Sequence, residues 1–340
     1  MPGSGPRPSR SRARQRGAAV LLALFIVTLA TLLITDLFWR QFVLFRTVEN
    51  QQRSAQSRLL LNGALEWARV ILLDQTHPSY DTLSDPWAQP LAQTPLNQMG
   101  DTGALVSQAT IEGGIEDGQS RFNLRNLVGG AGQINVAQLA ALDKLAGLLG
   151  APTGTARLIA GYVAQSYQNV PQVPTSAVAA AANAGGLNLR AGAVPLGSGT
   201  RPLPPVLPED LAGIPGMDPA AAQALVPFVI LLDQPNTAVN FNTASPQVMA
   251  AVIPDLGISD ANALAAERDR AYFVSVGDIQ NRLHGRGGTL PLGGISTNSS
   301  YFVVRGTIRL EPAATRMRAL LRRSMPGAAG RIDVLWEREE

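Results

Sequence analysis

An uncharged apolar run close to the N-terminus constrains this chain more than any other feature. Residues 18–34 read AAVLLALFIVTLATLLI, with no charge, proline or glycine, and apolar side chains return at residues 37–39 after Asp36. A run of this length crosses the hydrocarbon core of a bilayer as a helix. The 17 residues before it contain five arginines and no acidic residue. We therefore predict a transmembrane segment over residues 18–39, preceded by a basic head that cannot pack into a core.

The position of Gly17 indicates how the basic head is processed. A secretory signal carries a small-residue cleavage site after its apolar run, whereas here the run continues directly into residues 35–40, TDLFWR. Gly17 instead separates the arginines from Ala18. Cleavage between Gly17 and Ala18 would remove the head and leave the helix on the mature chain. An uncleaved anchor is the alternative.

Charge and cysteine content bound the location and the partners. Clustered arginine stays on the cytoplasmic side, which predicts a single-pass membrane protein with its N-terminus inside and its C-terminal domain on the outer face. The chain has no cysteine, so no disulfide stabilises the exported part. The net charge of +3 becomes −2 once the five arginines of the head are removed, which disfavours nucleic acid as a partner.

The apolar segment continues as one long helix. Between Ala18 and Leu73 there is no proline and one glycine, Gly63, which predicts a helix of about 55 residues, on the order of 80 Å long. Its second half carries apolar residues spaced i, i+3, i+4 and i+7, a pattern that predicts packing on a globular domain. This stripe comprises Leu60, Ala64, Trp67, Ala68, Ile71 and Leu72.

The rest of the chain alternates between strand and helix patterns. Short alternating runs, one of them broken by the turn signal Asp117-Gly118, predict strands over residues 104–111, 114–124, 301–310, 315–323 and 331–336. Between them, longer apolar runs predict helices over residues 136–149, 155–166, 219–232, 245–253 and 259–270. Residues 170–208 are rich in Ala, Gly and Pro, which predicts a long loop.

These patterns predict an α+β fold in which the N-terminal helix packs on a small antiparallel sheet and a large all-α domain is inserted between strands. The expected organisation is a leader, a transmembrane segment within a helix that runs to about residue 73, an α+β domain in two pieces, and an inserted helical domain. The corresponding ranges are 1–17, 18–39, 40–125 with 288–340, and 126–287.

The basic leader that ends in Gly17, the apolar helix and the downstream antiparallel sheet together resemble type IV pilins and the pseudopilins of type II secretion. Four motifs, with a large helical insertion between strands, look like the minor pseudopilin K family. The motifs are DTLSDPW at 81–87, DGQSRFNLRNL at 117–127, VNFNTA at 239–244 and YFVV at 301–304. The resemblance covers nearly the whole mature chain.

The resemblance implies a structural role. Prepilin peptidase would cut between Gly17 and Ala18 and methylate the new amine of Ala18. Most pilins carry a glutamate at the fifth mature position, which is Leu22 here; its partner in pilins is the terminal amine of the subunit above. An unpaired carboxylate in hydrocarbon is costly, so Leu22 fits a subunit with no neighbour above it.

The resemblance therefore implies a cap at the pseudopilus tip that assists initiation of assembly and export across the outer membrane. The expected partners are the minor pseudopilins I and J, the peptidase and the inner-membrane assembly platform.

A membrane-anchored DNA-binding protein is the alternative function. Residues 213–217, GIPGM, and residues 242–258 resemble helix-hairpin-helix units, which offer hairpin amides to phosphate. Three acidic residues next to these hairpins, Asp218, Asp255 and Asp260, would repel phosphate. The simpler interpretation is that the glycines make tight turns in a protein-binding insertion.

An enzymatic function has no support in the sequence. The chain has two histidines, His77 and His284, no cysteine, and no nucleophile elbow or phosphate loop. We therefore assign no catalytic and no cofactor-binding residues.

Calcium is the one ion to consider, because pseudopilins of this kind are sometimes calcium-bound and oxygen ligands suffice for it. Its candidate ligands are Asp81, Asp85, Glu116 and Asp117; solvated turn carboxylates or helix caps are the alternative interpretation.

Overall fold

The computed structural model describes most of the chain outside the leader. The described residues are 12–74, 77, 79–95, 109–129, 132–167, 201–285, 290–291, 293–310, 313–324 and 330–340. Residues 1–11 of the predicted leader, residues 104–108 of a predicted strand and most of the predicted loop over 170–208 lie outside this set. The chain divides into two units, Met1–Leu60 and Leu61–Glu340.

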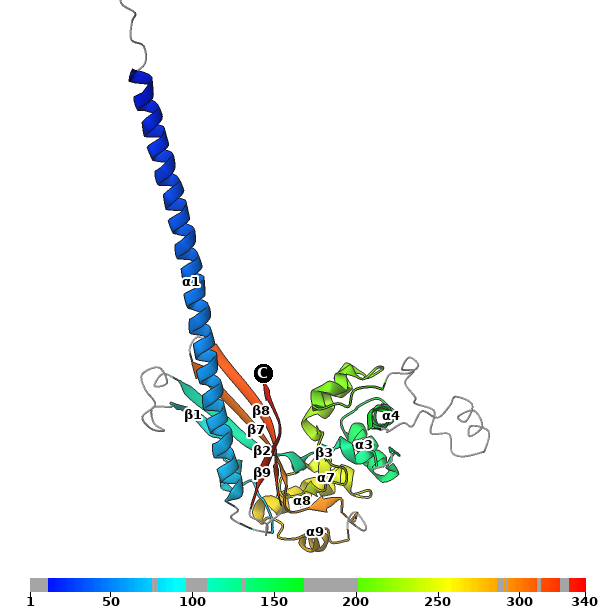
Figure 1. Cartoon of the computed structure of the whole chain (residues 1–340). Coiled ribbons are helices and arrows are strands. Elements are labelled where there is room, and N and C mark those ends of the chain that lie inside the picture. Colours follow the sequence, from blue (N-terminus) through cyan, green and yellow to red (C-terminus); the bar gives the residue numbers. More distant parts are fainter. Residues whose placement is uncertain are drawn as a thin grey trace, which may run out of the picture. The chain divides into compact units, whose positions relative to one another are not determined.

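Helix α1 (Arg12–Leu73) runs through both units without a break (Figure 1). Within the second unit it buries a face that repeats at i, i+4, i+7 and i+11, formed by Leu61, Leu65, Ala68 and Leu72. The predicted stripe shares Ala68 and Leu72 with this face, but Trp67 is 49% exposed. Apolar residues occur around most of this helix segment, so periodicity alone placed the stripe about one residue off.

The helix packs on a five-stranded antiparallel sheet in the order β1-β2-β7-β8-β9 (Figure 1). The strands are β1 (Leu91–Pro95), β2 (Thr110–Asp117), β7 (Tyr301–Leu310), β8 (Ala313–Arg323) and β9 (Ile332–Glu339). Neighbouring strands β2 and β7 are far apart in sequence because the insertion lies between them. The predicted α+β fold is confirmed, whereas β1 was not predicted.

Alternation along β7 separates the two faces of the sheet. Val304 and Gly306 lie on the face that α1 covers, where a Cβ on Gly306 would come within 3.2 Å of the Leu61 side chain. Gly113 pairs with Gly306 across the β2–β7 ladder, and a Cβ there would meet the backbone oxygen of Arg305 at 2.4 Å. Successive side chains point to opposite faces, so Arg305 belongs to the face that looks toward the insertion.

The insertion is mainly helical. Its α-helices are α3 (Val136–Leu148), α4 (Thr155–Tyr167), α6 (Pro219–Leu225), α7 (Pro246–Val252), α8 (Ile258–Arg270) and α9 (Val276–Arg282). Two parallel strand pairs that were not predicted connect them: β3 (Phe122–Asn123) with β4 (Val229–Ile230), and β5 (Val239–Asn240) with β6 (Ile295–Ser296). The predicted helix over 219–232 ends at Leu225, because Pro227 follows and the backbone turns into a 3-10 segment.

The insertion contains two apolar cores. One is built around α3, α4 and α6, and the other around α7, α8 and α9. Phe228 and Val252 pack against both. A third cluster joins the insertion to the sheet: Ile230 and Leu232 pack on Val303 and Leu320, which are paired in the β7–β8 ladder. The insertion is thus attached to the sheet face opposite α1.

The contact between α1 and the sheet can be tested with one buried residue. Leu65 is 4% exposed, so Leu65→Ala should lower the free energy of unfolding by about 2–5 kcal/mol through lost burial and the cavity that remains. Val70, 64% exposed on the same turns, provides the control: Val70→Ala should change it by less than about 0.5 kcal/mol. Urea unfolding of the detergent-purified chain measures both. Equal effects of the two changes would contradict this packing.

Candidate functional site

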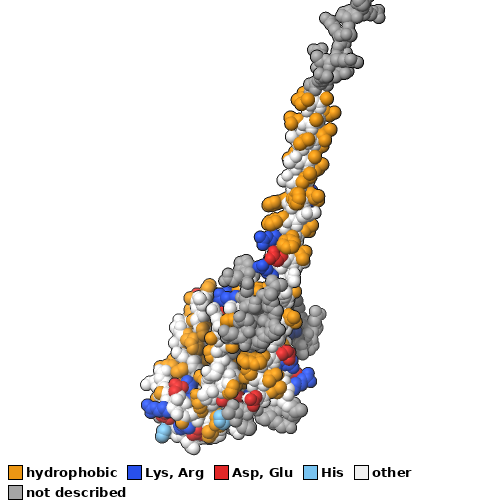
Figure 2. All heavy atoms as spheres, turned by 90° about the vertical axis from the view of Figure 1, so that its left-hand side faces the viewer, with side chains coloured by type: hydrophobic (Ala, Val, Ile, Leu, Met, Phe, Trp, Pro, Cys, Tyr) orange, Lys and Arg blue, Asp and Glu red, His pale blue; other side chains and the backbone are white. Residues whose placement is uncertain are grey.

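The first part of α1 meets the physical requirements of a membrane span. Among the described residues, α1 is the one helix that is long and apolar enough to cross a bilayer, and its mean hydropathy is 2.7 over its most apolar window. Three hydroxyls in this region, on Thr28, Thr31 and Thr35, donate to carbonyl oxygens three or four residues earlier, so no polar group there needs a partner in lipid. Hydrophobic side chains are spread along the visible face of this part of the helix (Figure 2).

The three residues of the predicted processing site lie on this helix. α1 begins at Arg12, so the helical backbone runs through Gly17 and Ala18. Leu22 is 60% exposed, so the predicted fifth mature position carries an exposed apolar side chain. The first charged pair comes later, where Arg40 Nε lies 2.8 Å from Asp36 Oδ2.

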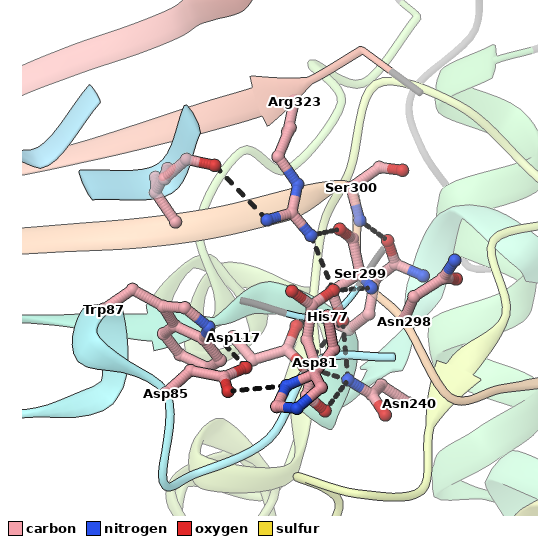
Figure 3. Close-up of polar contacts among 12 residues, drawn as sticks. His77, Asp81, Asp85, Trp87, Asp117, Asn240, Asn298, Ser299, Ser300 and Arg323 are labelled. Atoms are coloured by element: carbon pink, nitrogen blue, oxygen red, sulfur yellow. Dashed lines mark hydrogen bonds and ion pairs between the residues drawn. The ribbon is translucent and has the colours of Figure 1, made fainter. Parts of the chain in front are cut away.

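A buried polar junction forms where α1 ends and the sheet meets the insertion (Figure 3). Arg323, at the end of β8, pairs with Asp81 at 2.5 Å and donates to the carbonyl oxygens of Ser299 at 2.7 Å and Leu72 at 3.3 Å. Asp81 also accepts from the Ser299 backbone N–H at 2.8 Å. Both charged side chains are at least nine-tenths buried. One guanidinium therefore ties the last turn of α1 to the following loop and to the segment entering β7.

Asp117 is the second centre of this junction. Its carboxylate accepts from the Ser299 hydroxyl at 2.6 Å, the Asn240 amide at 3.0 Å, the Thr243 hydroxyl at 2.5 Å and the Gln119 backbone N–H at 2.7 Å. Burial raises the pKa of Asp117 to about 6, although the hydrogen bonds from Ser299, Thr243 and Gln119 lower it. The end of β2, the strand β5 and the entry to β7 thus converge on one carboxylate.

Two asparagines, Asn123 and Asn126, form a clamp separate from the junction. Asn123 donates to the Gln234 carbonyl and to the Thr237 hydroxyl, each at 3.0 Å. Asn126 exchanges two hydrogen bonds with the backbone of Thr237, at 2.8 and 3.0 Å. The clamp thus joins residues more than a hundred positions apart in the sequence. Both the clamp and the junction contain residues of the sequence motifs noted above.

Comparison with known proteins identifies the family of this chain. Two family models described as "Type II secretion system (T2SS), protein K" match the chain, one over residues 120–234 and the other over residues 239–304, together more than half of its length. The chain belongs to the protein K family of the type II secretion system.

A solved structure shares the fold of this protein K chain. A chain in the crystal structure of the GspK–GspI–GspJ complex from the enterotoxigenic Escherichia coli type 2 secretion system matches with a TM-score of 0.61 and 20% identity. The match covers 86% of this chain and 99% of that one. No curated protein sequence matches. Family and fold establish a minor pseudopilin with a structural, non-enzymatic role.

The four candidate calcium ligands of this protein K chain do not form one site. Three are buried: Asp81 and Asp117 belong to the junction, and Asp85 accepts from Thr82 and from the Trp87 indole within its own turn. Glu116 instead lies on the sheet face opposite α1, where it pairs with Arg121 and Arg305. Among the described residues, no group of three or more acidic or histidine side chains is arranged for a metal ion. Protein donors thus use the oxygens that calcium would need.

The two hairpins of the insertion are also occupied from within. At the first, the Asp218 carboxylate accepts from the Ala221 N–H at 3.0 Å and so takes the place where phosphate would bind the start of α6. At the second, Lys144, the single lysine of the chain, donates to carbonyl oxygens of Ile253, Pro254 and Leu256 at 2.7–2.9 Å. The Asp218 contact disfavours phosphate binding at the first hairpin, and the Lys144 contacts fix the second as a turn between α7 and α8.

The raised pKa of Asp117 predicts a defined pH dependence. In the folded chain the Asp117 carboxyl stays protonated up to about pH 6, whereas an unfolded aspartate, with a pKa of 3.8, loses its proton at lower pH. The Asp117 contribution to stability is therefore complete below about pH 4 and is lost as the pH rises to about 6. The unfolding free energy of the natural chain minus that of Asp117→Asn should fall by up to about 3 kcal/mol over this range. Urea unfolding at a series of pH values measures it.

Glu112→Gln is a control of opposite sign. The hydrogen bond from Arg309 lowers the pKa of Glu112, so the Glu112 contribution is lost as the pH falls through the acid range. A flat difference for Asp117→Asn between pH 4 and about 6 would contradict the assignment.

Proposed function

We propose that this minor pseudopilin caps the tip of the pseudopilus and helps to start its assembly. In this proposal α1 anchors the chain in the inner membrane, with the N-terminus in the cytoplasm and the C-terminal domain in the periplasm, until the helix enters the growing pseudopilus. The sheet and the insertion then form the outermost part of the fibre. The role is mechanical, because the family is structural.

The feature that carries the tip proposal is Leu22. Between Ala18 and Thr35 the helix has no charged side chain, and the hydroxyls there bond to their own helix. Once Gly17 is removed, the new amine of Ala18 is the one charge of this segment. Leu22 offers no carboxylate to an amine of a subunit above, so nothing in this segment requires such a subunit.

The proposed partners follow from the family. The solved structure with the same fold is described as a complex of GspK with GspI and GspJ; we propose that this chain assembles with minor pseudopilins I and J in the same way. Prepilin peptidase would process the chain between Gly17 and Ala18 and methylate Ala18, and the inner-membrane assembly platform would receive it.

Processing can be tested at Gly17. Gly17→Ala places a methyl group at the bond that the peptidase must cut, so we expect the precursor to accumulate and secretion to fall. Immunoblotting for the mass lost with the leader, together with mass spectrometry of the N-terminus for methylated Ala18, gives the readout. Normal processing and normal secretion would rule out the leader assignment.

The tip position can be tested by labelling. The chain has no cysteine, so Leu203→Cys, at a side chain that is 83% exposed, provides one unique thiol for maleimide-gold. Sheared pseudopili viewed by electron microscopy should carry gold at one end. The natural, thiol-free chain gives the background. Gold distributed along the shaft would contradict the tip proposal and leave family membership intact.

A further inference from the structure

A cleft lies between the insertion and the sheet face opposite α1. It has a volume of about 310 Å³, in the range of ligand-binding sites. Its apolar lining comes from both sides: Leu207, Pro227 and Ile230 from the insertion, and Val303 and Trp336 from the sheet. The third apolar cluster closes one end, since Ile230 and Val303 pack together there.

Three arginines also line this cleft: Arg121, Arg305 and Arg318. Arg305 lies directly opposite Arg318 in the β7–β8 ladder, and Arg318 lies directly opposite Arg338 in the β8–β9 ladder. Directly opposite residues share a face, so three like charges form a row across the sheet. Carboxylates of the chain compensate these charges: Glu116 pairs with Arg121 and Arg305, and Glu340 pairs with Arg318. Both carboxylates remain more than a third exposed, and exposed ion pairs are individually weak, so a carboxylate from a partner can exchange with them.

A carboxylate of the chain itself already occupies this row. Glu209, on the 3-10 segment Pro208–Gly213, accepts from Arg318 at 2.8 Å while its side chain remains 46% exposed. Burial raises the pKa of Glu209, but the hydrogen bond from Arg318 and the charges of Arg318 and Arg305 outweigh this and hold it below its usual value. Arg318 Nε is buried and has no hydrogen-bond partner among the described residues. Arg318 also pairs with Glu340 at 2.9 Å, so its buried Nε is the donor that these two carboxylates leave unused.

We propose that this cleft binds an extended peptide segment of a partner protein that carries an acidic side chain between apolar ones. The acidic side chain would displace Glu209 and pair with Arg318 and Arg305, and the flanking apolar side chains would pack against Trp336 and Leu207. A free inorganic anion would leave these apolar walls unused, which is why a peptide fits better. The site is independent of the tip position, so failure of one proposal leaves the other standing.

The test uses the full chain in nanodiscs and the fluorescein-labelled peptide acetyl-Gly-Val-Glu-Leu-Gly-amide, with its glutamine counterpart as the uncharged probe. Fluorescence anisotropy should show saturable binding of the glutamate peptide and about tenfold weaker binding of the glutamine peptide, the effect of one charged hydrogen bond. Glu209→Gln removes the competing carboxylate, so it should strengthen binding of the glutamate peptide about tenfold.

Two arginines of one strand provide the matched pair. Arg305→Gln should weaken binding about tenfold. Arg309 lies on the same face of β7, is 50% exposed and pairs with Glu112 outside the cleft, so Arg309→Gln should leave the affinity within about twofold. Thermal melting of each variant verifies that it is folded. The proposal is overturned by no saturable binding to either the natural chain or Glu209→Gln, by weaker binding to Glu209→Gln, or by equal losses for Arg305→Gln and Arg309→Gln.

Discussion

The buried ion pair between Arg323 and Asp81 is the contact on which the rest of the structure depends. Removing two charges from water is costly unless each finds further partners, and here Arg323 also donates to two carbonyl oxygens while Asp81 accepts a backbone N–H. Those partners belong to the end of α1, the following loop and the entry to β7. Loss of either charge would leave the other buried without compensation, so the end of α1, the following loop and the segment entering β7 all depend on this pair.

A fold held by such a buried ion pair suits a protein with a structural rather than an enzymatic role. The face of α1 from Leu61 to Leu72 packs on the sheet at Gly306, where the missing side chain lets Leu61 approach closely, and Gly113 allows the backbones of β2 and β7 to approach each other. The ion pair and the apolar face therefore contact the same part of α1.

Local patterns predicted the elements better than the contacts between them. The long helix, strands β7 to β9 and most helices of the insertion follow from periodicity and breakers that lie within each segment. The junction joins Asp81 to Arg323 across 242 residues, which no local pattern reports. A signal was present: Arg323 alternates with Leu321 at an inward position of β8, and a charge at such a position predicts a buried partner. The identity of that partner, Asp81, could come only from the fold.

The proposed peptide site would separate recognition from structure by the two faces of the sheet. Because side chains alternate along a strand, β7 presents Val304 and Gly306 to α1 and Val303 and Arg305 to the insertion. The α1 face tolerates little change, since its glycines and buried leucines are set by close packing. The opposite face carries charges that are partly exposed and individually weak in their effect on stability. Its side chains can therefore change with the partner while the packing on the α1 face is kept, so in this proposal specificity lies on the insertion side of the sheet.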